Sequence, residues 1–358
     1  MLRRFYVDNF RCLVNFEFRP ARVNLIVGKN GSGKSTLFDA IKVIAGLLDG
    51  ASVQTTLLAE SLPWWDIRRE QRFELDLEDA GVEFSYKVVV RHQPNRGAAI
   101  VEERFAVGGI EEITFEKGEL RLPSVPKGIP YQGGQSVLGV GLSRTPTVVQ
   151  FLQCVGRILL FRLDPWSFDI QATSENRMLN VNGSNLVAFL RHWSQADPEA
   201  FLDWKKRVAA DLPQFNDVQL REVVAGARML VGVKRFNNTE TSLNLASFSE
   251  GERVRLALDA IAGVATPAHV VALDEPDNFL APTEIQPILR RLTLETPRSG
   301  QPAQTIIVTH HPESIDYLAS HVTWLFEKDT DGLARIREKK FDRNLGERPT
   351  DSLLADLN

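Results

Sequence analysis

The stretch VNLIVGKNGSGKSTLFDAIKVIAGLL, from Val23 to Leu48, decides the fold. It begins with a β-rich apolar run that ends at Val27, continues through a glycine-rich turn, and ends in a segment of helical period. A strand, a glycine-rich turn and a helix in this order predict an α/β fold built around a phosphate-binding loop. The helix prediction depends on apolar residues that fall on one face: Leu37, Ala40, Ile41, Ile44 and Leu48.

The glycine-rich turn matches the pattern GxxxxGK[ST] from Gly28 to Ser35. Its glycines let backbone N–H groups turn inward around phosphate oxygens, and the following helix presents its positive end. Lys34 is expected to reach the β and γ phosphates of ATP, and Ser35 to ligate Mg²⁺. A chance glycine-rich turn is the alternative, which the flanking strand and helix disfavour. The residues expected to contact the nucleotide here are Gly28, Asn30, Gly31, Ser32, Gly33, Lys34, Ser35 and Thr36.

The segment HVVALDEP supplies a second part of the same kind of site. The run from His269 to Leu273 is typical of a buried parallel strand, and Asp274 and Glu275 stand at its carboxyl end, where α/β sites are built. Asp274 is expected to hold Mg²⁺, and Glu275 to orient or deprotonate the attacking water. The alternative is an acidic turn at the end of a strand with no catalytic part.

A third apolar strand, QTIIV, runs into Thr309, His310 and His311. A histidine at the end of such a strand stands where a γ-phosphate or a nucleophilic water would be met. His310 is favoured as the functional residue, because His311 precedes Pro312 and is suited to beginning the next turn.

The segment ASFSEGERVRLAL, residues 246 to 258, predicts a helix that begins near Ser249 and Gly251. Free N–H groups and a hydroxyl at such a helix start favour an anion. A local interpretation is equally available, in which Ser249 is an ordinary N-cap and Glu252 completes a capping box. The two interpretations are compatible. The apolar positions expected to face inward are Val254, Leu256, Ala257, Leu258 and Ile261.

Composition limits the class of protein. The chain has 358 residues, 43% of them hydrophobic, which is enough for one large core or one core with a smaller lobe. A net charge of -4 argues against a uniformly basic nucleic-acid binder. The two cysteines, Cys12 and Cys154, provide neither a disulfide framework nor a zinc site, so a cytoplasmic protein is expected. Nowhere do about 18 uncharged apolar residues follow one another, so no membrane-spanning helix is expected.

The middle of the chain changes character. Residues 71–122 alternate between apolar and polar positions and predict antiparallel strands, and residues 182–212 predict two helices. We therefore expect a single domain over residues 1–358 built from two lobes. Residues 1–50 and 240–328 would form the nucleotide-binding core, residues 51–239 an inserted lobe, β-rich and helical, and residues 329–358 a charged C-terminal tail.

Four motifs together resemble those of ABC-class ATPases. GKNGSGKST, SFSEGE, LDEPDNFLAP and VTHH follow the order of the family's Walker A, signature, Walker B with D-loop, and switch histidine. The N-terminal block FYVDNFRCLVNFEFRPARVNLIVGKNGSGKST is similar to the RecF/SMC-like branch, which includes stand-alone, OLD-type bacterial AAA ATPases. The resemblance covers roughly residues 1–50 and 240–328.

The resemblance implies a P-loop ATPase fold of the ABC type and a head-to-tail homodimer around two ATP·Mg²⁺. Lys34, Glu275 and His310 would be the catalytic residues. Ser249 and Gly251 would face the γ-phosphate bound by the partner, and Asp277 would lie in the D-loop beside the partner's site. Gln135, with Gln132 as second choice, is the candidate Q-loop residue that touches Mg²⁺ and nucleotide. Arg11 would face the nucleotide by the same resemblance, and a solvated surface arginine is equally consistent.

Three functions from different classes follow. The first is an ATP-hydrolysing switch that pairs on ATP binding and controls a separately encoded effector, as in bacterial phage-defence systems of this branch. The second is a RecF-like DNA-binding repair ATPase, and the third, which the sequence SFSEGE disfavours, is a transporter ATPase subunit. For the second, DNA is the partner, and a basic groove would draw on Arg68, Arg69, Arg290, Arg291 and Arg298.

Overall fold

The computed structural model describes residues 1–357 except 58, 64–66, 94–96, 124, 126, 213–214, 225, 238, 295–301 and 342–347. The contacts within it divide the chain into two units. The first unit comprises residues 1–159, 268–272 and 318–358, and the second comprises residues 160–267 and 273–317. Two of the four points where the chain passes between the units fall inside strands, β10 (Ile158–Phe161) and β15 (Val270–Asp274).

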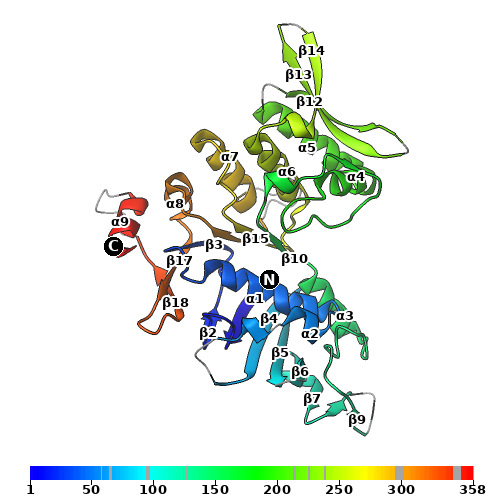
Figure 1. The fold of residues 1–358 in the computed structure, drawn as a ribbon, viewed down its shortest axis with the longest axis vertical. Coiled ribbons are helices and arrows are strands. Elements are labelled where there is room, and N and C mark those ends of the chain that lie inside the picture. Colours follow the sequence, from blue (N-terminus) through cyan, green and yellow to red (C-terminus); the bar gives the residue numbers. More distant parts are fainter. Residues whose placement is uncertain are drawn as a thin grey trace. The chain divides into compact units, whose positions relative to one another are not determined.

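In the first unit, the described residues form an antiparallel sheet of eight strands (Figure 1). The prediction of antiparallel strands over residues 71–122 is confirmed. In pairing order the strands are β2 (Phe16–Phe18), β1 (Leu2–Asp8), β4 (Glu70–Asp79), β5 (Val82–Gln93), β6 (Gly97–Val107), β7 (Ile110–Glu116), β8 (Glu119–Arg121) and β9 (Ile129–Pro130).

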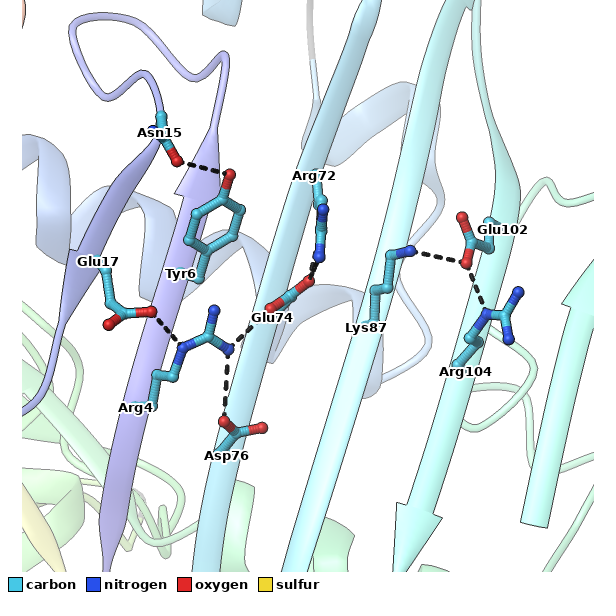
Figure 2. Close-up of polar contacts among 10 residues, drawn as sticks. All are labelled: Arg4, Tyr6, Asn15, Glu17, Arg72, Glu74, Asp76, Lys87, Glu102 and Arg104. Carbon is cyan, nitrogen blue, oxygen red and sulfur yellow. Dashed lines mark hydrogen bonds and ion pairs between the residues drawn. The ribbon is translucent and has the colours of Figure 1, made fainter. Parts of the chain in front are cut away.

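The two faces of this sheet differ because successive side chains point to opposite sides. On one face, Phe84, Tyr86 and Phe105 are buried and contact Phe151 of helix α3 (Pro146–Val155) at ring-centroid distances of 5.0 to 5.9 Å. On the other face, basic and acidic side chains alternate across the strands and pair with one another (Figure 2). The charged residues drawn there are Arg4, Glu17, Arg72, Glu74, Asp76, Lys87, Glu102 and Arg104.

Residues 23–48 form the predicted strand, turn and helix. Strand β3 (Val23–Gly28) is buried throughout and pairs in parallel with β17 (Val322–Lys328), which pairs antiparallel with β18 (Ala334–Lys339). Helix α1 (Lys34–Leu48) follows the turn, and all five residues of its predicted apolar face are buried. The predicted α/β fold with a P-loop is therefore confirmed. The shorter pieces of the first unit are α2 (Val53–Thr56), η1 (Ala59–Ser61) and α9 (Pro349–Leu357).

The second unit has its own apolar core. Trp193 and Trp204, both buried, lie in it together with Leu256 and Ala257 of the predicted signature helix. Helix α5 packs against strand β12, and the two predicted helices after residue 182 are confirmed. The elements are η2 (Pro165–Ser167), β11 (Gln171–Ala172), α4 (Leu186–Ala196), α5 (Pro198–Asp211), β12 (Phe215–Glu222), β13 (Arg228–Phe236), β14 (Thr239–Asn244), η3 (Leu245–Ser247) and α6 (Glu250–Val264) (Figure 1).

The rest of the second unit follows β15. Helix α7 (Pro282–Thr293) leads to strand β16 (Gln304–Val308), which is buried at every position, and helix α8 (Pro312–Leu318) comes next. The N–H of Glu275, just after β15, donates to the carbonyl oxygen of Val308 at 2.8 Å. The ends of these two strands therefore lie together. None of the described helices has the length and apolar character needed to cross a bilayer.

The observed division cuts across the predicted insertion over residues 51–239. Residues 51–159 belong to the same unit as the P-loop, because their strands pair with β1. The predicted C-terminal tail also contributes structure: the alternating segment ARIREK forms β18, with Ala334 fully buried. Pairing with β17 gives the backbone of this charged segment a place in a sheet.

Candidate functional site

The P-loop of the first unit is shaped by close backbone packing. A Cβ added at Gly28 would lie 2.2 Å from the carbonyl oxygen of Phe326 in β17, so only glycine fits. The ammonium of Lys34 is buried and donates to the carbonyl oxygens of Gly28 at 2.7 Å and Lys29 at 3.0 Å. The loop therefore holds its own lysine against the turn that the motif predicts to bind phosphate.

Two features of this loop fit a phosphate group. The hydroxyl of Ser32 is buried and has no hydrogen-bond partner among the described residues, and a buried polar group in that state calls for a ligand or water. Helix α1 begins at Gly33, which has no side chain to cap the first N–H groups of the helix. A phosphate oxygen would satisfy both the hydroxyl and the helix end.

Arg11 lies along α1. Its guanidinium is half-exposed, forms an ion pair with Asp39 of α1, and stands 5.2 Å from the ring of Phe10. Its neighbour Cys12 places Sγ 3.9 Å from the hydroxyl of Thr36, so the thiol lies beside the first turn of α1. Arg11 therefore lies beside the helix that follows the P-loop, and its contact with the nucleotide stays a prediction.

The acidic end of β15, in the second unit, has an unusual backbone. Glu275 has a φ of 52°, in the left-handed region that side chains other than glycine rarely adopt. Asn278 donates from Nδ2 to Oε2 of Glu275 at 2.7 Å, which fixes the direction of the carboxylate. Backbone strain of this kind collects at functional sites, where the surrounding structure enforces it.

His310 is brought to Glu275. Its Nε2 lies 3.8 Å from Oε1 of Glu275, and both side chains are about two-fifths exposed. His311 has a structural part instead: its N–H donates to the hydroxyl of Thr309, and its Nδ1 accepts the N–H of Glu313 at the start of α8. His311 thus begins the turn into α8, as predicted, and the assignment of His310 as the functional histidine stays a prediction.

Asp274, the predicted metal ligand, is buried and paired with a residue that the motif analysis did not single out. Arg162 directly follows β10, a neighbour of β15 in its sheet, and donates from both Nε, at 2.8 Å, and Nη2 to one carboxylate oxygen, Oδ2. The sequence carries a signal for it: the apolar run ILLF over residues 158–161 suits a buried strand, and a polar residue just after such a strand falls at the edge where α/β sites form.

The predicted signature helix begins as the local interpretation required. Ser249 is the N-cap of α6: its hydroxyl accepts the N–H of Glu252, and the Glu252 carboxylate accepts the N–H of Ser249. Ser249 is exposed, and the proton of its hydroxyl remains available to an anion. Lys234 of β13 pairs with Glu252 at 2.6 Å, which ties the helix start to that sheet. The predicted inward face of the helix is buried at all five positions.

Gly251 and Asp277 are both held inside the second unit. A Cβ at Gly251 would lie 2.7 Å from the carbonyl oxygen of Phe279, so the signature segment packs closely on the chain that follows β15. The carboxylate of Asp277 is buried and accepts hydrogen bonds from the hydroxyls of Thr309, at 2.6 Å, and Ser314. Asp277 thus binds together the ends of β15 and β16, and its predicted contact with a partner's nucleotide remains a prediction.

Gln135 requires a correction. Its Nε2 donates to the carbonyl oxygen of Gly50 at 2.7 Å, just beyond the C-terminal end of α1. The P-loop lies at the other end of that 15-residue helix, about 20 Å away at the rise of an α-helix. Gln135 therefore cannot reach a metal or nucleotide held by that P-loop, and its prediction as the Q-loop residue is wrong.

The arginines proposed for a basic groove are largely engaged with acids. Arg68 pairs with Asp8 at 2.8 Å. Arg291 of α7 pairs with Asp211 and Asp259, and buried Arg255 of α6 pairs with the same two acids. These contacts join α5, α6 and α7 within the second unit. Arg69 and Arg290 are exposed, and Arg298 lies outside the described residues.

Known protein families match both parts of the chain. Residues 4–119 match the family model described as "AAA domain", and residues 169–316 match the one described as "AAA domain, putative AbiEii toxin, Type IV TA system". Both matched segments are AAA domains by description. The first includes the P-loop, and the second includes Ser249, Glu275 and His310. No curated protein matches the chain at a significant level.

Two solved structures are similar to this chain over nearly its whole length. The SMC head domain from Thermotoga maritima has 15% identity and a TM-score of 0.49, and covers 95% of this chain and 99% of its own. The recombination mediator protein RecF-ATPrS in the RecFOR pathway has 12% identity and a TM-score of 0.46, and covers 94% of this chain and 98% of its own. Neither score supports a statement about substrate or partner.

Proposed function

We propose that this protein is an ATPase that binds ATP·Mg²⁺ at the P-loop and hydrolyses it with Glu275 and His310. The observation that carries the proposal is the cluster at the ends of β15 and β16. There a carboxylate in a strained backbone position is oriented by Asn278 and stands 3.8 Å from an imidazole. A general base and a polar partner in fixed geometry are what activation of a water requires.

Each residue has a task that its chemistry suits. Lys34 and the hydroxyl of Ser32 bind phosphate oxygens, and Ser35 and Asp274 are the residues that would hold Mg²⁺. When bound, Mg²⁺ neutralises charge on the β and γ phosphates. Glu275 accepts a proton from the attacking water, and His310, beside it, donates a hydrogen bond toward the γ-phosphate or the water.

We further propose that the active form is a head-to-tail homodimer. The support is the exposed start of α6, where the Ser249 hydroxyl and the positive helix end suit an anion. In a dimer of this kind, the α6 start of one protomer would complete the site of the other.

The output of the switch is proposed to be control of a separately encoded effector in a bacterial defence system. The support is the description of the family model matched by residues 169–316, which names the AbiEii toxin and a Type IV TA system. A DNA-binding repair function is the alternative, and the ion pairs of Arg68 and Arg291 give it no support.

The test is the mass in solution of Glu275→Gln with and without ATP and Mg²⁺. We expect ATP binding to be kept, hydrolysis to fall by at least about a hundredfold because the general base is lost, and the mass to double only when ATP and Mg²⁺ are both present. Light scattering coupled to gel filtration measures the mass, and phosphate release measures the turnover.

Two further variants separate the parts of the proposal. Lys34→Ala should lose nucleotide binding, and Ser249→Arg should bind ATP but neither pair nor turn over. Wild-type turnover in Ser249→Arg would contradict a site completed by the partner, and an ATP-independent mass would contradict the switch. Salt-sensitive binding of duplex DNA by the ATP-bound Glu275→Gln protein would favour the repair function instead.

A further inference from the structure

The ion pair between Arg162 and Asp274 is unequal in its exposure. The side chain of Asp274 is 4% exposed, whereas that of Arg162 is 58% exposed. The backbone N–H of Arg162 donates to the carbonyl oxygen of Val181 at 2.8 Å, so the main chain is anchored while the guanidinium lies largely in solvent. The side chain of Arg162 can therefore leave the ion pair while its main chain stays in place. The side chain of Asp274 is buried at the end of β15 and has to stay where it is.

A buried carboxylate needs a counter-charge. An ionised aspartate removed from water without a partner costs several kcal/mol, which the guanidinium offsets here. Two of its N–H groups converge on the single oxygen Oδ2, the two-point contact that arginine makes better than lysine.

A divalent cation would compete with Arg162 for Asp274. Carboxylate oxygens are the ligands that Mg²⁺ prefers, and Oδ2 already accepts two charged hydrogen bonds. A guanidinium and a divalent cation on the same carboxylate would repel each other because they would lie within a few ångströms. Occupation by one therefore lowers the affinity for the other.

We propose that Arg162 is a positioning residue of the metal site, which holds Asp274 before Mg²⁺·nucleotide binds and is displaced when it does. This inference rests on the proposed function, because it takes Asp274 as a metal ligand. Arg162 then has two effects: it holds the buried carboxylate in place, and it raises the Mg²⁺ concentration needed to load the site.

The test is the Mg²⁺ dependence of nucleotide binding, measured with a fluorescent ATP analogue that cannot be hydrolysed. In Arg162→Gln the half-saturating Mg²⁺ concentration should fall by at least about threefold, because the competing charged hydrogen bonds are gone. Binding of the analogue in EDTA should stay unchanged. Arg221→Gln, which removes an arginine that donates to Gln219 and Ser242 in the same unit, is the matched control and should leave the Mg²⁺ dependence as in the wild type.

A second readout separates this competition from a purely structural ion pair. Without ligand, Arg162→Gln should unfold at a lower temperature than the wild type. Mg²⁺ and the analogue should then raise its unfolding temperature by more than they raise that of the wild type, because the metal replaces the lost counter-charge. If Arg162→Gln does not fold, Arg162→Lys serves in its place, since lysine keeps the charge but loses the two-point contact.

The outcomes distinguish the inference from the function on which it rests. An unchanged or higher Mg²⁺ requirement in Arg162→Gln or its lysine substitute would overturn the inference. Asp274→Asn should raise the Mg²⁺ requirement strongly. If Asp274→Asn binds Mg²⁺ and analogue like the wild type, the assignment of Asp274 as a metal ligand is itself wrong. If Asp274→Asn fails to bind Mg²⁺ and the analogue while Arg162→Gln has the Mg²⁺ requirement of the wild type, Asp274 remains a metal ligand and only the competition by Arg162 is wrong.

Discussion

At the scale of single residues, the proposed ATP hydrolysis depends on Glu275 more than on any neighbour. Its φ of 52° is a backbone conformation that most side chains avoid, at a cost of about 1 to 2 kcal/mol. The N–H of Glu275 is bonded to Val308, and its carboxylate is bonded to Asn278. The strand end therefore enforces a strained residue where a reactive carboxylate is proposed.

Glycine at position 275 should relieve this strain. We expect Glu275→Gly to be more stable than Glu275→Ala by about 1 kcal/mol, because both variants lose the carboxylate and only glycine accepts the left-handed backbone without cost. Urea unfolding of the nucleotide-free variants measures the difference, and both should lose ATP hydrolysis. A glycine variant less stable than the alanine variant would mean that the backbone at this position is not strained.

At the scale of elements, a buried glutamate joins the large sheet to the far end of α1. Glu103 of β6 is fully buried and accepts hydrogen bonds from the hydroxyls of Tyr86, at 3.0 Å, and Ser136, at 2.6 Å, and from the N–H of Val137, at 2.8 Å. Ser136 and Val137 belong to a loop that also places Gly139 against the carbonyl oxygen of Leu47, in the last turn of α1. This carboxylate therefore fixes a loop that supports the helix of the P-loop.

Glu103 should make stability depend on pH. Burial raises the pKa of Glu103 above its ordinary value of 4.5, and the hydrogen bonds from Ser136 and Val137 oppose that rise only in part. The folded protein thus retains a proton that the unfolded chain has released. The stability contributed by this residue is complete below about pH 4.5 and is lost as the pH rises through the folded pKa. The stability advantage of wild type over Glu103→Gln should therefore shrink from pH 4.5 upward, as measured by urea unfolding at several pH values.

The adjacent Glu102 provides a control with the opposite sign. Partial burial pushes the pKa of Glu102 upward, but hydrogen bonds from Lys87 and Arg104 outweigh it and lower the pKa below its ordinary value (Figure 2). Its stability contribution is present above about pH 4.5 and lost as the pH falls, so the advantage over Glu102→Gln should grow with pH. If the stability differences of Glu103→Gln and Glu102→Gln from the wild type changed with pH in the same direction, the opposite pKa shifts of the two residues would be wrong.

At the scale of the whole molecule, the proposed catalytic residues are divided between two units that the chain visits in turn. The P-loop belongs to the first unit, and Ser249, Glu275 and His310 belong to the second. The chain passes between the units four times: within β10, after Pro267, within β15 and after Tyr317. The proposed ATPase therefore needs residues of both units, and a probe beside the P-loop in the first unit can report on bound nucleotide.

The two cysteines supply such a probe. Burial raises the pKa of Cys154 to about 11, with a further contribution from Asp79, whereas Cys12 is only partly buried and lies beside Thr36. At pH 8 we expect a thiol reagent to label Cys12 promptly and Cys154 only after unfolding, because the thiolate is the reactive form. ATP should slow the labelling of Cys12, and Cys12→Ser should abolish the prompt phase. Equal labelling rates with and without ATP would place bound nucleotide away from Thr36.

The sequence predicted those features in which one short segment carries its own signal. The helix from Lys34 to Leu48 and the capping box of Ser249 and Glu252 are local patterns of period and spacing, and the structure contains both. Gln135 was misplaced because the Q-loop assignment depended on resemblance across a variable region, where no local pattern states how far a glutamine lies from the P-loop. The tail residues 334–339 were also judged by charge, although their alternation suits a strand.

By itself, the sequence determined the α/β class, the P-loop with its helix, and the identity of the strand ends that carry Asp274, Glu275 and His310. The tertiary structure alone decided which side chains donate hydrogen bonds to these acids. Arg162 donates to Asp274, Asn278 donates to Glu275, and Thr309 and Ser314 donate to Asp277. The physical reason is that motifs record the local geometry of the backbone. The partner of a buried carboxylate is chosen by strand pairing between segments that lie far apart, such as residues 162 and 274.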